Sequence, residues 1–95
     1  MLLCILQRGW ANGFHMANRI LYWEVWNEPN LDLFWEGSAE EYFRLYEVVA
    51  LKIKEVNSTF KVGGPTTAGV DYPYIRSFLD YMKSHNVPVD VVSFH

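Results

Sequence analysis

The sequence predicts an α/β fold in the order β-α-β-α-β, with parallel strands that form part of a larger barrel. Short β-branched and aromatic runs alternate with longer segments of helical periodicity. Such alternation implies parallel strands joined by crossover helices. With 51% hydrophobic and 17% aromatic residues in 95 positions, the chain has more apolar side chains than a domain of this length can bury in its own core.

The first strand is predicted over residues 20–26, a β-branched and aromatic run that stops at an Asn-Glu-Pro turn. Before it, Gly9, Asn12 and Gly13 interrupt every period. Residues 1–19 are therefore interpreted as a poorly defined N-terminal segment, and residues 20–95 as the partial barrel domain.

The first helix begins at a capping box. Ser38 precedes Glu41 by three positions, so that their side chains can satisfy backbone amides reciprocally. Asn57 closes the helix. Apolar residues recur on one helical face at Tyr42, Leu45, Tyr46, Val49, Ile53 and Val56.

Two further strands and a second helix follow. Residues 60–62 predict a short strand that ends in a turn at residues 63–65, Gly-Gly-Pro. A helix is predicted from Tyr72 or Tyr74 to Ser84, and residues 89–94 predict the third strand. The helix has an apolar stripe at Ile75, Phe78, Leu79 and Met82. His95 then falls at the strand edge where parallel α/β sheets build their sites.

Composition excludes several functional classes. The net charge is −3 and the eight Lys and Arg residues form no run, so no nucleic-acid partner is expected. Cys4 is the single cysteine, and the three histidines have no metal-ligand spacing, so neither a metal nor another cofactor is expected. No segment approaches the roughly 20 apolar residues of a membrane span, and no signal peptide is recognisable. A soluble chain of unassigned compartment is therefore expected.

The most informative motif is WNEPN, residues 26–30. Because a proline disfavours helical backbone in the residue before it, Pro29 predicts an extended Glu28 with a fixed side-chain direction. A glycosidic general acid needs such a fixed carboxyl beside apolar walls, for which Trp26 or Trp35 are candidates. Asn27 adds an uncharged amide that could bind a sugar hydroxyl.

Three blocks in order then resemble glycoside hydrolase family 39, which contains β-xylosidases and α-L-iduronidases. They are YWEVWNEPNL at residues 22–31, VGGP at 62–65 and VPVDVVSFH at 87–95. Together they are more specific than Asn-Glu-Pro alone, which many barrels share. Asn30 after the proline is more similar to the xylosidase branch.

The resemblance implies a retaining mechanism on a (β/α)8 barrel that cleaves β-xylosides or related sugars. It implies that Glu28 is the acid/base, that Asn27 binds the sugar 2-hydroxyl and that His95 contacts the sugar. The three strands would be barrel strands four, five and six. The nucleophilic Glu of the family would follow strand seven, outside this chain, so the isolated chain is expected to be inactive.

A second carboxylate within the chain has little support. Retaining enzymes hold their two carboxyls about 5–5.5 Å apart and inverting ones about 6.5–9.5 Å apart. Glu24 is four residues before Glu28, roughly 13 Å away along an extended strand. Asp32, Glu36 and Asp71 stay open alternatives, because the sequence does not give the paths of their loops.

Other interpretations also stay open. Glu28 could be a solvated turn carboxylate and Asn27 a turn residue. Trp35 is the best candidate for stacking on a sugar, but it could instead cover a helix end. The chain could be a carbohydrate-binding or structural remnant without chemistry. Open strand edges could also pair between copies and cause self-association.

Overall fold

The computed structural model describes residues 21–95. The segment 1–19, Ile20 of the predicted first strand and Cys4 lie outside the described residues. The elements are β1 (Tyr22–Glu24), α3 (Ala39–Val56), β2 (Lys61–Thr67), α4 (Tyr72–Ser84) and β3 (Val91–Phe94). The predicted β-α-β-α-β order is therefore confirmed.

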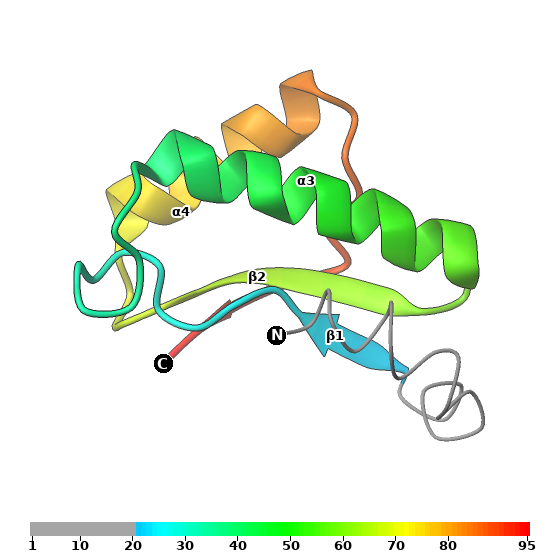
Figure 1. Ribbon diagram of the computed structural model, residues 1–95, viewed down its shortest axis with the longest axis horizontal. Coiled ribbons are helices and arrows are strands. Elements are labelled where there is room, and N and C mark those ends of the chain that lie inside the picture. Colours follow the sequence, from blue (N-terminus) through cyan, green and yellow to red (C-terminus); the bar gives the residue numbers. More distant parts are fainter. Residues whose placement is uncertain (1–20) are drawn as a thin grey trace.

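The three strands form one parallel sheet in the order β1-β2-β3. Trp23 pairs with Val62, and Gly64 pairs with Val92. The loop after β1, the turn after β2 and the C-terminal end of the chain consequently meet at one edge of the sheet (Figure 1). β1 and β3 are the outer strands, and self-association through their edges stays a prediction that size-exclusion chromatography tests.

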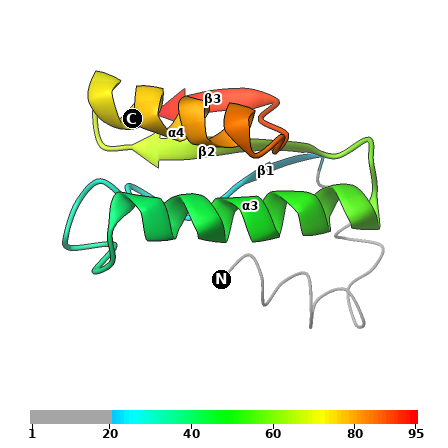
Figure 2. The ribbon, with the colours of Figure 1, turned by 90° about the horizontal axis from the view of Figure 1, so that it is seen from above.

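Both helices cover the same face of the sheet (Figure 1). Figure 2 shows α4 over β2 and β3, and α3 beside it on the β1 side. The core lies between these layers, where Trp23, Val25 and Val62 meet the helices. The predicted stripe of α3 is largely confirmed: Leu45 and Val56 are half-buried, and the buried residues of the helix are Tyr42, Phe43, Tyr46, Val49, Ala50 and Ile53.

The capping box of α3 is present as predicted. The Ser38 hydroxyl accepts from the Glu41 amide at 3.1 Å, and the Ser38 amide donates to the Glu41 carboxylate at 3.0 Å. Hydrogen bonds from the Ser38 backbone and side chain lower the pKa of Glu41. At the other end, the Asn57 amide donates to the Ile53 carbonyl. This helix begins and ends where its sequence signals predict.

The prediction of a turn at residues 63–65 is wrong, because β2 continues through them to Thr67. The glycines serve close packing instead. A Cβ on Gly63 would lie 2.3 Å from the Val91 carbonyl oxygen, and one on Gly64 would lie 3.1 Å from the Tyr42 hydroxyl. Glycine in a strand marks close approach of this kind. The longer β2 carries its carboxyl end past the tip of β1.

α4 begins at Tyr72, one of the two predicted starts, and its N-cap is Asp71, whose side chain accepts from the Tyr74 amide. Phe78 and Met82 are buried as predicted, but Leu79 is 38% exposed. The buried stripe of α4 is therefore narrower than the sequence pattern predicts, because only one side of the helix packs against the sheet. Within residues 21–95, neither helix is long and apolar enough to cross a membrane.

Candidate active site

Two of the predicted site residues meet at the carboxyl edge of the sheet. Nδ1 of His95 lies 3.1 Å from Oε2 of Glu28. The Glu28 side chain is 21% exposed and that of His95 is 48% exposed. The pair is thus accessible from one side, so the Glu28 carboxyl is neither locked in a buried salt bridge nor directed to the opposite edge.

The backbone prediction for Glu28 is wrong. Its φ is +48°, in the left-handed region, and Trp26 before it has φ +72°. Pro29 disfavours right-handed helical backbone at Glu28, and the chain adopts the left-handed alternative instead of an extended one. Two backbone bonds fix this turn: the Glu28 amide donates to Thr66 O at 2.9 Å, and the Glu28 carbonyl accepts from Leu31 N at 3.1 Å. A left-handed backbone conformation in a residue other than glycine costs about 1–3 kcal/mol of stability, and it is typical of functional sites.

The end of β2 holds both site residues. The Thr66 carbonyl accepts the Glu28 amide at 2.9 Å, and the Thr67 carbonyl accepts the His95 amide at 2.8 Å. Thr66 and Thr67 are fully buried. Thr66 also has a left-handed backbone, with φ +54°. We call residues 66–68 the β2 hub, because they bind the backbone of two site residues that come from different parts of the chain.

Asn30 connects the loop after β1 to the third residue of the β2 hub. Its Oδ1 accepts from the Ala68 amide at 2.9 Å, and its Nδ2 donates to the Ala68 carbonyl at 3.2 Å. Nδ2 also donates to Oδ2 of Asp71 at 3.0 Å. The other Asp71 oxygen accepts from the Tyr74 amide at 3.2 Å. Both oxygens of Asp71 are therefore engaged in structure, which disfavours it as a second catalytic carboxylate.

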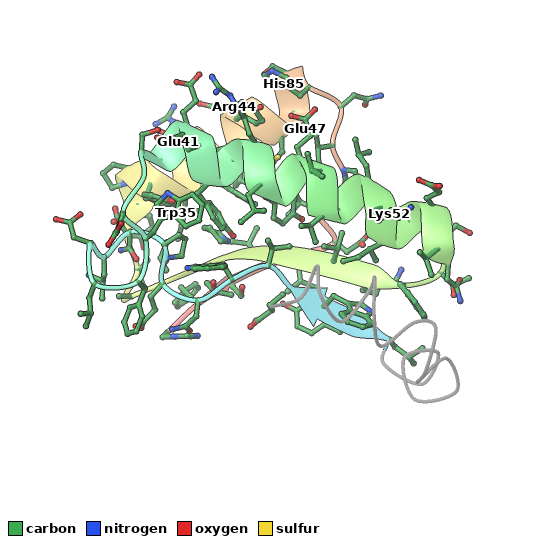
Figure 3. The ribbon with its side chains drawn as sticks, viewed as in Figure 1. Trp35, Glu41, Arg44, Glu47, Lys52 and His85 are labelled. Atoms are coloured by element: carbon green, nitrogen blue, oxygen red, sulfur yellow. The ribbon has the colours of Figure 1, made fainter. Side chains whose placement is uncertain are left out.

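Trp35 lies beneath the N-terminal turns of α3, on the side that faces the sheet (Figure 3). Its indole N–H donates to the Ser38 carbonyl at 2.9 Å, and its ring meets Trp26 edge-on at 5.4 Å. The ring also packs edge-on against Tyr42. These contacts fit the alternative that Trp35 covers a helix end, and sugar stacking by its ring stays a prediction. Asn27 has an exposed side chain next to Glu28.

Glu24, the last residue of β1, is engaged by a neighbour on its own strand. The Tyr22 hydroxyl donates to its carboxylate at 3.0 Å. Burial and this hydrogen bond raise the pKa of Tyr22. Asp32 and Glu36 lie exposed in the loop between β1 and α3. Within the described part of the chain, no group of three or more His, Cys, Asp or Glu side chains is placed to hold a metal ion.

The sequence predicts Glu28 and His95 as site residues, and the structure brings them together, but the sequence does not predict the β2 hub. The hub acts through backbone carbonyls, which carry no side-chain signal. Asn30 is the one signal in the sequence that could have indicated it, because an asparagine amide both donates and accepts and can bridge two loops.

Comparison with known proteins assigns the chain. It matches Glycosyl hydrolases family 39 over residues 14–95. A β-xylosidase from Caldicellulosiruptor saccharolyticus is 49% identical over 75 residues, which is 78% of this chain and 15% of that protein. A β-xylosidase from Geobacillus stearothermophilus is 46% identical over 78 residues, which is 81% of this chain and 16% of that protein. The chain thus spans about a sixth of the length of these relatives.

Solved structures give the same assignment. The crystal structure of the GH39 enzyme from Xanthomonas axonopodis pv. citri superposes with a TM-score of 0.81 at 34% identity, covering 99% of this chain and 18% of that one. The GH39 neighbours are (β/α)8 barrels, so the three parallel strands and two helices are a portion of such a barrel, as predicted. This chain belongs to the glycosyl hydrolases family 39.

Proposed function

We propose that this chain supplies the acid/base half of a retaining glycoside hydrolase site that acts on β-xylosides. Glu28 is the acid/base, Asn27 and His95 contact the sugar, and the nucleophilic carboxylate comes from outside the chain. The observation that carries the proposal is the contact between Glu28 and His95 at the carboxyl edge of a parallel sheet.

The geometry of Glu28 supports this role. A general acid must reach the glycosidic oxygen, so its carboxyl has to be accessible yet held in place. The Glu28 side chain is 21% exposed, while its backbone amide and carbonyl are both hydrogen-bonded. In a retaining enzyme the same carboxyl first protonates the leaving oxygen and then deprotonates the water that releases the sugar.

Membership of family 39 supports a nucleophile outside the chain, and the carboxylates within the chain suit that role poorly. Glu24 binds the Tyr22 hydroxyl, and Asp71 binds Asn30 and caps α4. Asp32 and Glu36 lie exposed in the loop between β1 and α3, whereas a nucleophile must be held about 5–5.5 Å from the acid/base. Hydrolysis therefore requires a complete barrel, and the isolated chain should be inactive.

The test places residues 21–95 in the matching segment of the Caldicellulosiruptor saccharolyticus relative, which supplies the rest of the barrel. Glu28→Gln should lower kcat/KM for xylobiose by about 10²–10⁴-fold, the usual contribution of a general acid or base. A 2,4-dinitrophenyl xyloside has a leaving group that needs no proton, so its cleavage to the covalent intermediate should be much less affected. Added azide should accelerate turnover and yield a xylosyl azide of retained configuration.

Glu36→Gln is the matched control, because it neutralises an exposed glutamate in the same loop. Its kinetics should equal those of the unsubstituted chimera. An inactive unsubstituted chimera, or full activity of the Glu28→Gln chimera on xylobiose, would contradict the proposal. Retained xylobiose binding without any turnover would instead favour the alternative of a carbohydrate-binding remnant.

A further inference from the structure

We infer that Asn30 is a positioning residue for the Glu28 carboxyl, acting by clamping the loop after β1 onto the β2 hub. The inference rests on the proposed function, because it assigns Asn30 an effect on proton transfer by Glu28. Asn30 itself does not touch the reacting atoms in this role.

The clamp is built from three hydrogen bonds of one amide. Asn30 both donates to and accepts from the backbone of Ala68, and it donates to Asp71. These bonds join loops that lie 38 to 41 residues apart in the sequence. The Asn30 side chain is partly buried there, so water competes only weakly for its partners.

The clamp bears on Glu28 because the two residues share one short turn. Pro29 lies between them and is buried, so a movement of Asn30 is transmitted along a stiff connection. Glu28 has a left-handed backbone, which persists only where surrounding contacts enforce it. The Thr66 carbonyl holds the Glu28 amide on one side of Pro29, and Asn30 holds the turn on the other.

The same hub fixes His95 through the Thr67 carbonyl. Loosening Asn30 therefore leaves His95 in place while Glu28 shifts relative to it. The distance between the two side chains, 3.1 Å in the intact clamp, should lengthen. Proton delivery depends steeply on such distances, whereas binding of the sugar does so less.

The experiment compares Asn30→Ala with Asn57→Ala in the chimera. Asn57 is the control because its side chain also accepts hydrogen bonds from a nearby residue, Thr59, but at the C-terminal end of α3. Asn30→Ala should lower kcat for xylobiose by about 10- to 100-fold, as expected for a small misplacement of a catalytic group. It should change kcat/KM for the 2,4-dinitrophenyl xyloside by less than about threefold, because that leaving group bypasses the acid. Asn57→Ala should leave the ratio between the two substrates unchanged.

A paired substitution separates the clamp from a general loss of structure. Asn30→Asp removes the two N–H donors of the amide and places a second carboxylate against that of Asp71. Combining it with Asp71→Asn restores a donor opposite an acceptor and keeps a good cap for α4. The double variant should therefore be more active on xylobiose than Asn30→Asp alone.

The outcomes are distinguishable from those that test Glu28. Equal losses on both substrates in Asn30→Ala, or no gain from the added Asp71→Asn, would overturn the positioning role even if Glu28→Gln behaves as expected. An unaffected Glu28→Gln chimera would overturn the proposed function itself. A selective loss on xylobiose together with rescue by the pair would support the clamp.

Discussion

His95 Nδ1 lies 3.1 Å from Glu28 Oε2, although 67 residues separate the two positions in the chain. The contact exists because β1 and β3 are both parallel to β2, so that their carboxyl ends reach the same edge. Each of the two residues also has its backbone amide bound to the β2 hub. Two residues that are distant in sequence therefore lie in contact, and the backbone of each is held by the β2 hub.

The first prediction concerns this contact. His95→Ala in the chimera should lower kcat/KM for xylobiose by about 10- to 100-fold, because a hydrogen bond to a charged group contributes about 1.5–3 kcal/mol. The effect on the 2,4-dinitrophenyl xyloside should be smaller, if the imidazole acts through Glu28. Steady-state kinetics with both substrates measures the difference.

His85→Ala is the control for that substitution. His85 is exposed at the end of α4, where its ring stacks on Tyr81 at 3.9 Å. Its removal should leave both rates unchanged. Unaltered kinetics in His95→Ala would mean that the observed contact has no part in turnover.

Much of the frame could be predicted from the sequence because its signals are local. Ser38 and Glu41 form the capping box that their spacing indicates. Parallel strands place all their carboxyl ends at one edge, so the proximity of Glu28 and His95 follows once three strands are recognised. Alternation and capping therefore suffice for the element order and for the location of the candidate site.

The details that orient the site could not be predicted, because they depend on contacts distant in sequence. The left-handed backbone of Glu28 depends on the Thr66 carbonyl, and local restriction by Pro29 alone favours a different conformation. Likewise, Gly63 and Gly64 have the composition of a turn. They lie within β2 because Val91 and Tyr42 approach too closely for a side chain.

The second prediction concerns acid stability. Lys54 Nζ lies 2.8 Å from Asp90 Oδ2, which also accepts from the Val62 amide at 2.9 Å. Burial raises the pKa of Asp90, but the bonds from Lys54 and Val62 and the charge of Lys54 outweigh it, so the pKa is lowered from 3.8. A carboxyl with a lowered folded-state pKa stabilises the fold above its unfolded pKa. That contribution is lost as the pH falls through the folded value.

Urea unfolding of this chain between pH 7 and pH 2.5 tests this linkage. Lys54→Met removes the chief partner of Asp90 and should lower the free energy of unfolding at pH 7. The difference from the unsubstituted chain should shrink as the pH falls below about 4, where Asp90 becomes protonated in the unfolded state. A difference that stays constant over the whole range would contradict the assignment.

The last prediction compares two buried hydroxyls in the aromatic cluster between α3 and α4. The Tyr42 hydroxyl donates at 2.6 Å to the carbonyl of Val25, the residue that follows β1. The Tyr74 hydroxyl is buried and has no hydrogen-bond partner among residues 21–95. Tyr42→Phe leaves a buried carbonyl unpaired and should lower the free energy of unfolding by about 1–3 kcal/mol. Tyr74→Phe removes a hydroxyl whose burial is not compensated by a hydrogen bond among residues 21–95, so the free energy of unfolding should stay the same or rise. Urea denaturation of both variants measures the two changes. Because both substitutions keep the ring, equal destabilisation by both would show that the bond to Val25 does not set the cost.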